Sequence, residues 1–191
     1  MKSGLSWSVR AAFAAALALT ALPAAATVGG SFLVAARAAP APSGAQSLCS
    51  TYSWACDGRA GAQRSREMDL VKRVNRSVNA STREISDRSQ YAREEHWALP
   101  TRRGGDCEDF ALIKKRELIR SGVAPARLLI ATALDRQRRS HAVLIYRSTG
   151  GDVVLDNQTD RLRGWQQTGY VFLRMQDPAD PRRWVSGFTS R

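Results

Sequence analysis

Residues that bind soft metals or serve as nucleophiles and bases are scarce in this chain, which has three cysteines and two histidines among 191 residues. The cysteines, at positions 49, 56 and 107, do not have the spacing of a zinc finger. A zinc site that used Cys107 and His141 would lack two further soft ligands at a suitable spacing. The chain also has no internal repeat and no glycine-rich loop of the dinucleotide-binding type, which argues against a repeat protein and against a dinucleotide-binding protein.

Acidic residues are also few, with 17 Asp and Glu against 29 Lys and Arg, so the formal net charge is +12. The basic residues are scattered, with no run longer than two or three, and no aromatic-rich RNA-binding signature accompanies them. We therefore expect a solvated basic surface and no nucleic-acid partner. Anionic lipid or an acidic protein partner would also suit the charge.

Long apolar runs are confined to the N-terminus. Lys2 and Arg10 precede an Ala/Leu-rich run over residues 11–22, and small residues follow up to Ala26. This arrangement is typical of a secretory signal peptide that is cleaved near Ala26. An uncleaved anchor is the alternative, since apolar residues resume at 32–36, although proline and glycine interrupt the span.

The sequence predicts three segments: a signal peptide at 1–26, a disordered spacer at 27–47, and one folded domain at 48–191. The spacer contains the stretch "APAPSGAQS", which is rich in proline and small residues. We expect a periplasmic protein without stable membrane insertion after the signal peptide is cleaved.

Cys49 and Cys56 lie close enough to close the short loop "CSTYSWAC". In an oxidising exported compartment this favours a disulfide between them, which would leave Cys107 as a single thiol. Spacing alone does not decide the pairing, and three buried, reduced cysteines are the alternative.

Two helices are expected in the first half of the domain. Apolar residues recur at three- and four-residue steps from Arg66 to Val78, which predicts an amphipathic helix, and a polar loop over 81–100 follows. Asp106 then suits the N-cap of a second helix that ends at Ser121-Gly122, with Asp109 in a capping-box-like position. Cys107 therefore lies in the first turn of this helix.

After residue 122 the pattern changes to the β-branched and aliphatic runs "RLLIATALD", "HAVLIYR", "DVVLD" and "YVFLRM", which predict strands. The connection at 148–151 is typical of a hairpin. The order of helices followed by an antiparallel sheet predicts an α+β fold.

His141 is a better candidate base than His96, because His141 opens a predicted strand whereas His96 lies in a polar loop. A two-residue turn in the hairpin would place Val143 opposite Asp156, so His141 and Asp156 would share one sheet face. Asp156 is therefore the expected partner of the imidazole, with Asn157 as the runner-up. A three-residue loop would shift the register and remove this relation.

The set Cys107, His141 and Asp156 suits acyl transfer through a thioester, in which the thiol attacks, the imidazole moves protons and the carboxylate holds the imidazole. The start of a helix favours a thiolate. The flanking acids oppose it, so an imidazolium or a bound metal must offset them. A lone strand histidine is otherwise most often structural.

The stretches "WALP", "GGDCEDFALIKKRELIRSG", "HAVLIY" and "VVLDN" together resemble the bacterial transglutaminase-like cysteine proteinases, which include periplasmic LapG-type adhesin-releasing proteases. The resemblance covers most of the chain after about Cys49. It implies a papain/transglutaminase-like fold with the nucleophile at a helix N-terminus. By position, it assigns the catalytic cysteine, histidine and aspartate to Cys107, His141 and Asp156.

The resemblance also implies calcium dependence through Asp106 and Glu108, whose oxygen ligands suit calcium. The alternative is that Asp106 is only a helix cap and Glu108 a favourable first-turn acid. The partners that the resemblance implies are a large surface adhesin as substrate and an inner-membrane cyclic-di-GMP receptor as regulator.

Three functions stay open at this point. The first is an exported cysteine endopeptidase, and the second is a transglutaminase or acyltransferase that uses the same triad. The third is a non-catalytic module that holds an acidic partner on its basic surface.

Overall fold

The structure is a computed structural model that describes Met1 and residues 31–190. The predicted signal peptide at 1–26 lies outside the described residues apart from Met1, as do the first four residues of the predicted spacer. Among the helices that the structure describes, none has the length and apolar character needed to cross a membrane.

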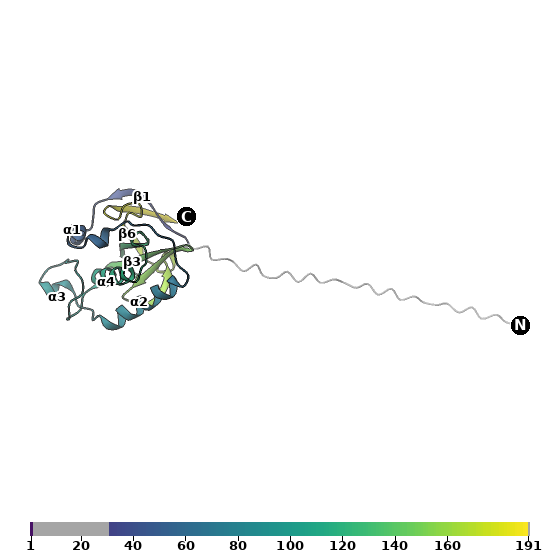
Figure 1. Ribbon diagram of the computed structural model, residues 1–191, viewed down its shortest axis with the longest axis horizontal. Helices are drawn as coiled ribbons and strands as arrows, with labels where there is room; N and C mark the ends of the chain where they lie inside the picture. Colours follow the sequence, from purple (N-terminus) through teal and green to yellow (C-terminus); the bar gives the residue numbers. More distant parts are fainter. Residues whose placement is uncertain (2–30, 191) are drawn as a thin grey trace.

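A seven-stranded antiparallel sheet forms the centre of the described domain (Figure 1). Its strand order is β1-β7-β6-β2-β3-β4-β5, so the N-terminal strand lies beside the C-terminal one at one edge. The strands are β1 (Leu33–Ala39), β2 (Leu128–Leu134), β3 (Ser140–Ser148), β4 (Gly151–Asp156), β5 (Thr159–Gly164), β6 (Val171–Gln176) and β7 (Trp184–Ser190).

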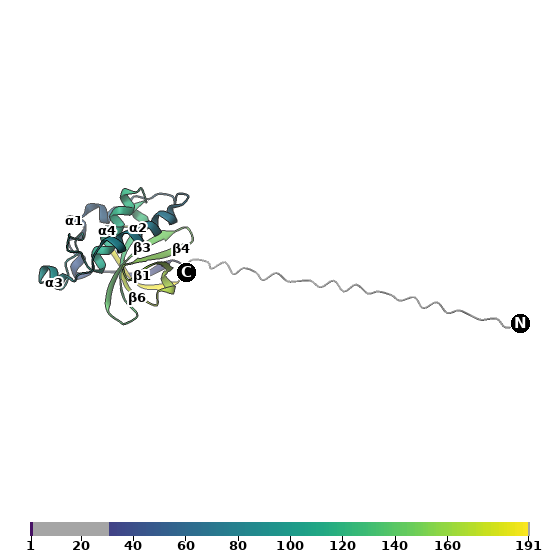
Figure 2. The same cartoon turned by 90° about the horizontal axis from the view of Figure 1, so that it is seen from below.

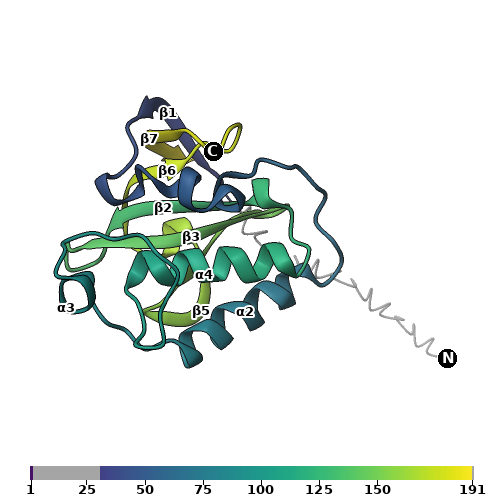
Figure 3. The same cartoon turned by 60° about the vertical axis from the view of Figure 1, so that its left-hand side comes forward.

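The helices gather on one side of this sheet, as Figures 2 and 3 show. Helix α4 packs against β3, and α2 packs against α4 and β5. The helices are α1 (Leu48–Thr51), α2 (Glu67–Ser81), α3 (Asp87–Tyr91) and α4 (Cys107–Arg120). The α+β architecture predicted from the order of apolar patterns is confirmed.

The alternation of side chains along the central strands separates two apolar cores. On the helix side, Leu112 and Leu118 of α4 pack with Ile130 and Leu144 of the sheet. On the other side, Leu129 and Val143 pack with Leu33 of β1 and Val185 of β7. Strands β2 and β3 are buried on both faces, which explains why their sequences read as nearly continuous apolar runs.

The two predicted helices are both present. The helix expected at 66–78 is α2, and the helix expected to begin near Cys107 is α4. Helix α4 ends before Gly122, whose φ of +87° lies in the region that favours glycine. The polar segment at 81–100 contains the short helix α3, which was predicted to be loop.

The prediction of a disordered spacer at 27–47 is wrong for its described part. Residues 33–39 form β1, which pairs with β7 along its whole length, and Leu33 is buried. The partner strand lies about 150 residues further along the chain, so no local pattern in this alanine-rich stretch reveals the pairing. The folded domain therefore begins well before Cys49.

Cys49 and Cys56 form the predicted disulfide, with their Cα atoms 5.4 Å apart. Cys107 is the one free cysteine within the described residues. The disulfide closes the turn between α1 and the following 3₁₀ helix, which packs beside α4.

Lys115 of α4 is fully buried. Its ammonium donates hydrogen bonds to the backbone oxygen of Ala55 at 2.6 Å and to Oε1 of Gln176 at 2.7 Å. No carboxylate bonds to it in the part of the chain that the structure describes. Burial therefore lowers the pKa of Lys115 to about 7.

Replacing Lys115 by methionine should flatten the pH dependence of stability above neutral pH. The native lysine loses its proton near pH 7, whereas the unfolded one keeps it up to about 10.5. The unfolded state thus binds more protons in this window, and the free energy of unfolding rises with pH by up to about 1.4 kcal/mol per pH unit. Urea denaturation across the window measures this slope.

The variant leaves no acceptor unpaired, because Gln176 Oε1 also accepts the N–H of Ile130 and Ala55 also accepts from Gln176 Nε2. Burial also lowers the pKa of Lys114 to about 7, so Lys114 should maintain part of the pH dependence of stability in the variant. Lys72→Met on the exposed face of α2 is the control. An equal slope in wild type and Lys115→Met would contradict the prediction.

Candidate active site

A tight turn precedes Cys107, which is the first residue of α4. Gly104 has a φ of +123°, and a Cβ at this position would overlap the backbone oxygen of Arg83. Gly105 bonds to the same oxygen through its N–H at 3.1 Å. Only glycine fits at position 104, so the double glycine holds the start of α4 against the preceding segment.

Asp106 occupies the N-cap position as predicted, but its side chain does not cap the helix. Its carboxylate instead accepts a hydrogen bond from the N–H of Asp87 at 3.1 Å. Asp109 accepts from the N–H of Ala98 at 2.9 Å. The two acids therefore hold the loop before the helix, where a local capping box was expected.

His141 and Asp156 meet across the β3–β4 hairpin. The ladder pairs Leu144 with Leu155 and Ser148 with Gly151, which is the register of the predicted two-residue turn. His141 Nε2 lies 2.9 Å from Asp156 Oδ1, and both side chains are buried. The structure thus brings together the predicted histidine and aspartate, and Asp156 makes this contact rather than Asn157.

His96 lies elsewhere, with its ring stacked edge-on to Tyr91 at 4.5 Å. Its backbone N–H donates to the carboxylate of Asp87. These contacts give His96 a structural position in the loop after α3, in agreement with the choice of His141.

Tyr170 also contacts the pair, and sequence reasoning missed it. Its hydroxyl donates to Asp156 Oδ2 at 2.6 Å, and its ring lies edge-on to His141 at 5.5 Å and 89°. The N–H of Gln158 donates to Asp156 as well, at 3.0 Å. Burial raises the pKa of Asp156, but the hydrogen bonds from His141, Tyr170 and Gln158 outweigh it, so the pKa lies below the usual range.

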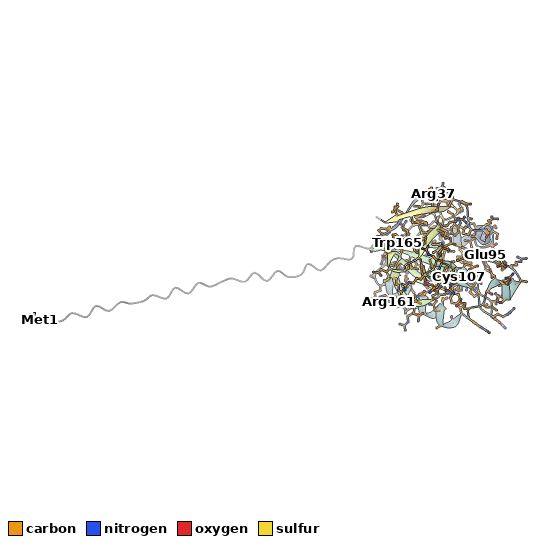
Figure 4. The ribbon with its side chains drawn as sticks, turned by 180° about the vertical axis from the view of Figure 1, so that it is seen from behind. Met1, Arg37, Glu95, Cys107, Arg161 and Trp165 are labelled. Carbon is orange, nitrogen blue, oxygen red and sulfur yellow. A yellow bond between two sulfur atoms is a disulfide. The ribbon has the colours of Figure 1, made fainter. Side chains whose placement is uncertain are left out.

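Cys107 and His141 line one cavity of about 190 Å³, together with Trp97, Glu108 and Ala142. The sulfur accepts the N–H of Ala142 at 3.3 Å, and the thiol donates to Glu108 Oε2 at 3.2 Å. Figure 4 shows the position of Cys107 in the domain. Burial and the adjacent Glu108 carboxylate raise the pKa of the thiol well above its usual range, which the Ala142 N–H only partly offsets.

Three acids cluster beside the thiol: Asp87, Asp106 and Glu108 each offer an oxygen, and these oxygens lie within 4.8 Å of one another. Sequence reasoning found two of them and missed Asp87, which comes from α3. Burial, with the Asp106 carboxylate, raises the pKa of Glu108 to about 9 and also raises that of Asp87. Asp106 Oδ1 is buried and has no hydrogen-bond partner within the described residues.

The model of one protein family, described as bacterial transglutaminase-like cysteine proteinase BTLCP, matches residues 35–190. The chain belongs to this family. The match begins inside β1, so it includes most of the strand that was predicted to be spacer. Among curated protein sequences, none matches the chain.

Solved structures of LapG from Legionella pneumophila have a similar fold. The calcium-bound form has a TM-score of 0.51 at 24% identity over 58% of this chain. The EGTA-treated form has a TM-score of 0.51 at 22% identity over 69% of this chain and 79% of its own. The chain spans 65% of the calcium-bound LapG chain, slightly less than two thirds.

Tyr170→Phe should lower the free energy of unfolding by about 1.5–3 kcal/mol near neutral pH, because a hydrogen bond to a charged acceptor is lost. The folded pKa of Asp156 lies below 3.8, so its ionised form stabilises the fold above that pH, and the contribution is lost as the pH falls through the folded pKa. The difference between wild type and variant should therefore shrink on acidification. Urea denaturation over a pH series measures it.

Tyr52→Phe is the matched control, since the Tyr52 hydroxyl accepts from the neutral N–H of Leu99 at 3.2 Å. Its cost should not depend on pH through Asp156. A Tyr170→Phe cost that stays constant down to pH values below 3.8 would show that the hydroxyl does not stabilise the carboxylate.

Proposed function

We propose that the chain is an exported cysteine endopeptidase that cleaves peptide bonds through a thioester intermediate. The observation that carries the proposal is that Cys107 and His141 line one cavity, with the thiol at a helix start and the imidazole bonded to the buried carboxylate of Asp156. Membership of the cysteine proteinase family supports it.

In the proposed reaction the Cys107 sulfur attacks the carbonyl carbon of the scissile bond. Asp156 holds Nε2 of His141, so Nδ1 is the ring nitrogen that takes the thiol proton and then passes it to the leaving amine. A water molecule, deprotonated by the same nitrogen, hydrolyses the thioester and releases the sulfur. The backbone N–H of Cys107 at the helix start is a donor for the oxyanion.

Tyr170 serves this scheme as a positioning residue. Its hydroxyl holds the second oxygen of Asp156, and its ring covers one edge of His141. The imidazole is thereby fixed in one orientation, with Nδ1 free of the carboxylate.

Cys107→Ala should abolish cleavage of a proteome-derived peptide mixture, with a loss of at least about a thousand-fold, since the nucleophile acts as part of a unit. Mass spectrometry of the products measures it. Cys49→Ala/Cys56→Ala, which removes the disulfide but leaves the cavity residues, is the control for general damage. Full peptidase activity in Cys107→Ala would refute the proposed function.

The same triad supports a transglutaminase or acyltransferase, in which an amine replaces water as the acceptor. Incorporation of a labelled amine into a glutamine-bearing protein, without peptide cleavage, would favour that activity. A non-catalytic binding module is the other alternative. It would be favoured if the Cys107 thiol reacted with an alkylating agent no faster than a free thiol.

The acids beside Cys107 fit the calcium dependence that the family resemblance implies. Asp87, Asp106 and Glu108 would hold the ion through hard oxygen ligands, and the unpartnered Asp106 Oδ1 is an oxygen without another role. A calcium ion there would supply positive charge beside carboxylates that otherwise oppose a thiolate. The similar fold of calcium-bound LapG supports this part of the proposal.

Calcium should raise the melting temperature of the wild-type protein, and EGTA should reverse the shift. An ion at one hundred times its Kd adds about 2.7 kcal/mol to the free energy of unfolding. Asp87→Asn, which keeps an acceptor for the N–H of His96, should lose most of the shift. The control is Asp69→Asn on the exposed face of α2. A melting temperature indifferent to calcium and EGTA would remove the metal from the proposal.

The proposed location is the periplasm, the proposed substrate is a large surface adhesin, and the proposed regulator is an inner-membrane cyclic-di-GMP receptor. The family resemblance and the LapG-like fold support these assignments. Comparison of the surface and released proteins of cells with and without this chain tests them. A surface adhesin fragment should be released only when the chain is present.

A further inference from the structure

A second hollow continues the reactive cavity along the sheet. It has a volume of about 500 Å³ and shares Thr132, Leu173 and Arg174 with the cavity that holds Cys107 and His141. It runs toward the edge strand β1, where residues 37–40 line it. A peptide bound with its scissile bond at Cys107 therefore has a continuous path across β6 and β7 to β1.

A β-bulge turns an apolar side chain into this path. Arg174 of β6 pairs with Thr132 of β2 and Phe172 pairs with Ala133, so Leu173 has no partner on β2. Leu173 is 42% exposed, and among the described residues only Met1 and Val171 are large apolar side chains with comparable exposure. Bulges that redirect one side chain are common beside active sites.

The charges along the path are asymmetric. Among the described residues, Arg37 and Arg174 line this hollow and no acidic residue does. Arg37 bonds to the hydroxyl of Ser186 at 3.3 Å, and neither arginine forms an ion pair within the part of the chain that the structure describes. Glu95 and Glu108 line the cavity that holds Cys107, with Arg174 where it meets the hollow. Figure 4 shows Arg37 at the outer edge of the domain, with Cys107 nearer the middle of the domain.

The geometry points to a substrate subsite in this hollow, which takes a segment with one or more acidic residues next to an apolar one. Leu173 contacts the apolar residue, and Arg174 and Arg37 pair with the acidic residues further from the scissile bond. Glu95 disfavours acidic residues on its own side, so the charges also set the direction of the bound peptide. This inference rests on the proposed peptidase activity and names the class of its substrate.

The test uses the purified protein and a proteome-derived peptide library, with the cleaved bonds located by mass spectrometry. The expected result is an excess of Asp and Glu on one side of the cleaved bonds, which weakens as salt is added. In Arg37→Ala/Arg174→Ala, kcat/KM on a selected acidic peptide should fall about ten-fold. On its Asn/Gln counterpart the loss in this variant should be clearly smaller, because that peptide has no acid for the arginines to pair with.

Arg76→Ala/Arg182→Ala is the matched control, because it removes the same charge from exposed arginines on α2 and on the turn before β7. It should keep the preference. Cleavage by the wild type without an acidic preference, or a preference that survives in Arg37→Ala/Arg174→Ala, would overturn the subsite and leave the peptidase intact. If the wild type cleaved no peptide at all, the peptidase itself, and the subsite with it, would be overturned.

Discussion

The register of the β3–β4 hairpin is the constraint on which the candidate site depends. Side chains alternate between sheet faces, so a shift of one residue would move Asp156 to the face opposite His141. The two-residue turn after Ser148 prevents this shift, and the burial of both strands on both faces reinforces it. Helix α4 packs across β3, so the same strand that orients His141 also fixes where Cys107 lies. Cys107, His141 and Asp156 thus derive their relative positions from one strand.

Local patterns were enough to predict this part of the molecule. The apolar periodicity predicted α2 and α4, and the hairpin turn predicted the His141–Asp156 contact. These features depend on residues that are close in the sequence. The remaining features depend on distant pairing. β1 forms a strand because it pairs with β7. Asp87 comes to the site from α3, and Tyr170 comes from the segment before β6. Strands β5 and β7 are polar or weakly alternating, so they carry little of the period-two signal that revealed the central strands.

The acids near Cys107 illustrate why local sequence misleads at a functional site. Asp106 and Asp109 have the spacing of a capping box, yet both carboxylates bind backbone N–H groups of the preceding loop. The loop and α3 are therefore attached to the start of α4 through buried carboxylates. This attachment places Asp87 beside Asp106 and Glu108, where burial and the Asp106 carboxylate raise the pKa of Glu108 and of Asp87. Such a cluster lowers the free energy of unfolding unless a proton or a cation neutralises it. The same neutralisation would remove negative charge that opposes a thiolate at Cys107.

The basic charge of the chain acquires a different meaning once the fold is known. Along the sequence the arginines are scattered, which suggested only a solvated surface. The sheet order places β1 beside β7 and β6 beside β2. Arg37 and Arg174 therefore line the same hollow, although they are 137 residues apart in the sequence. Several other arginines pair with nearby acids, as Arg139 does with Asp135 and Arg147 with Asp152. Among the described residues neither arginine has an ion-pair partner, and both line a hollow that adjoins the Cys107 cavity, so their charge is available to a ligand. Selectivity for an acidic segment would then come from two side chains rather than from the net charge of +12.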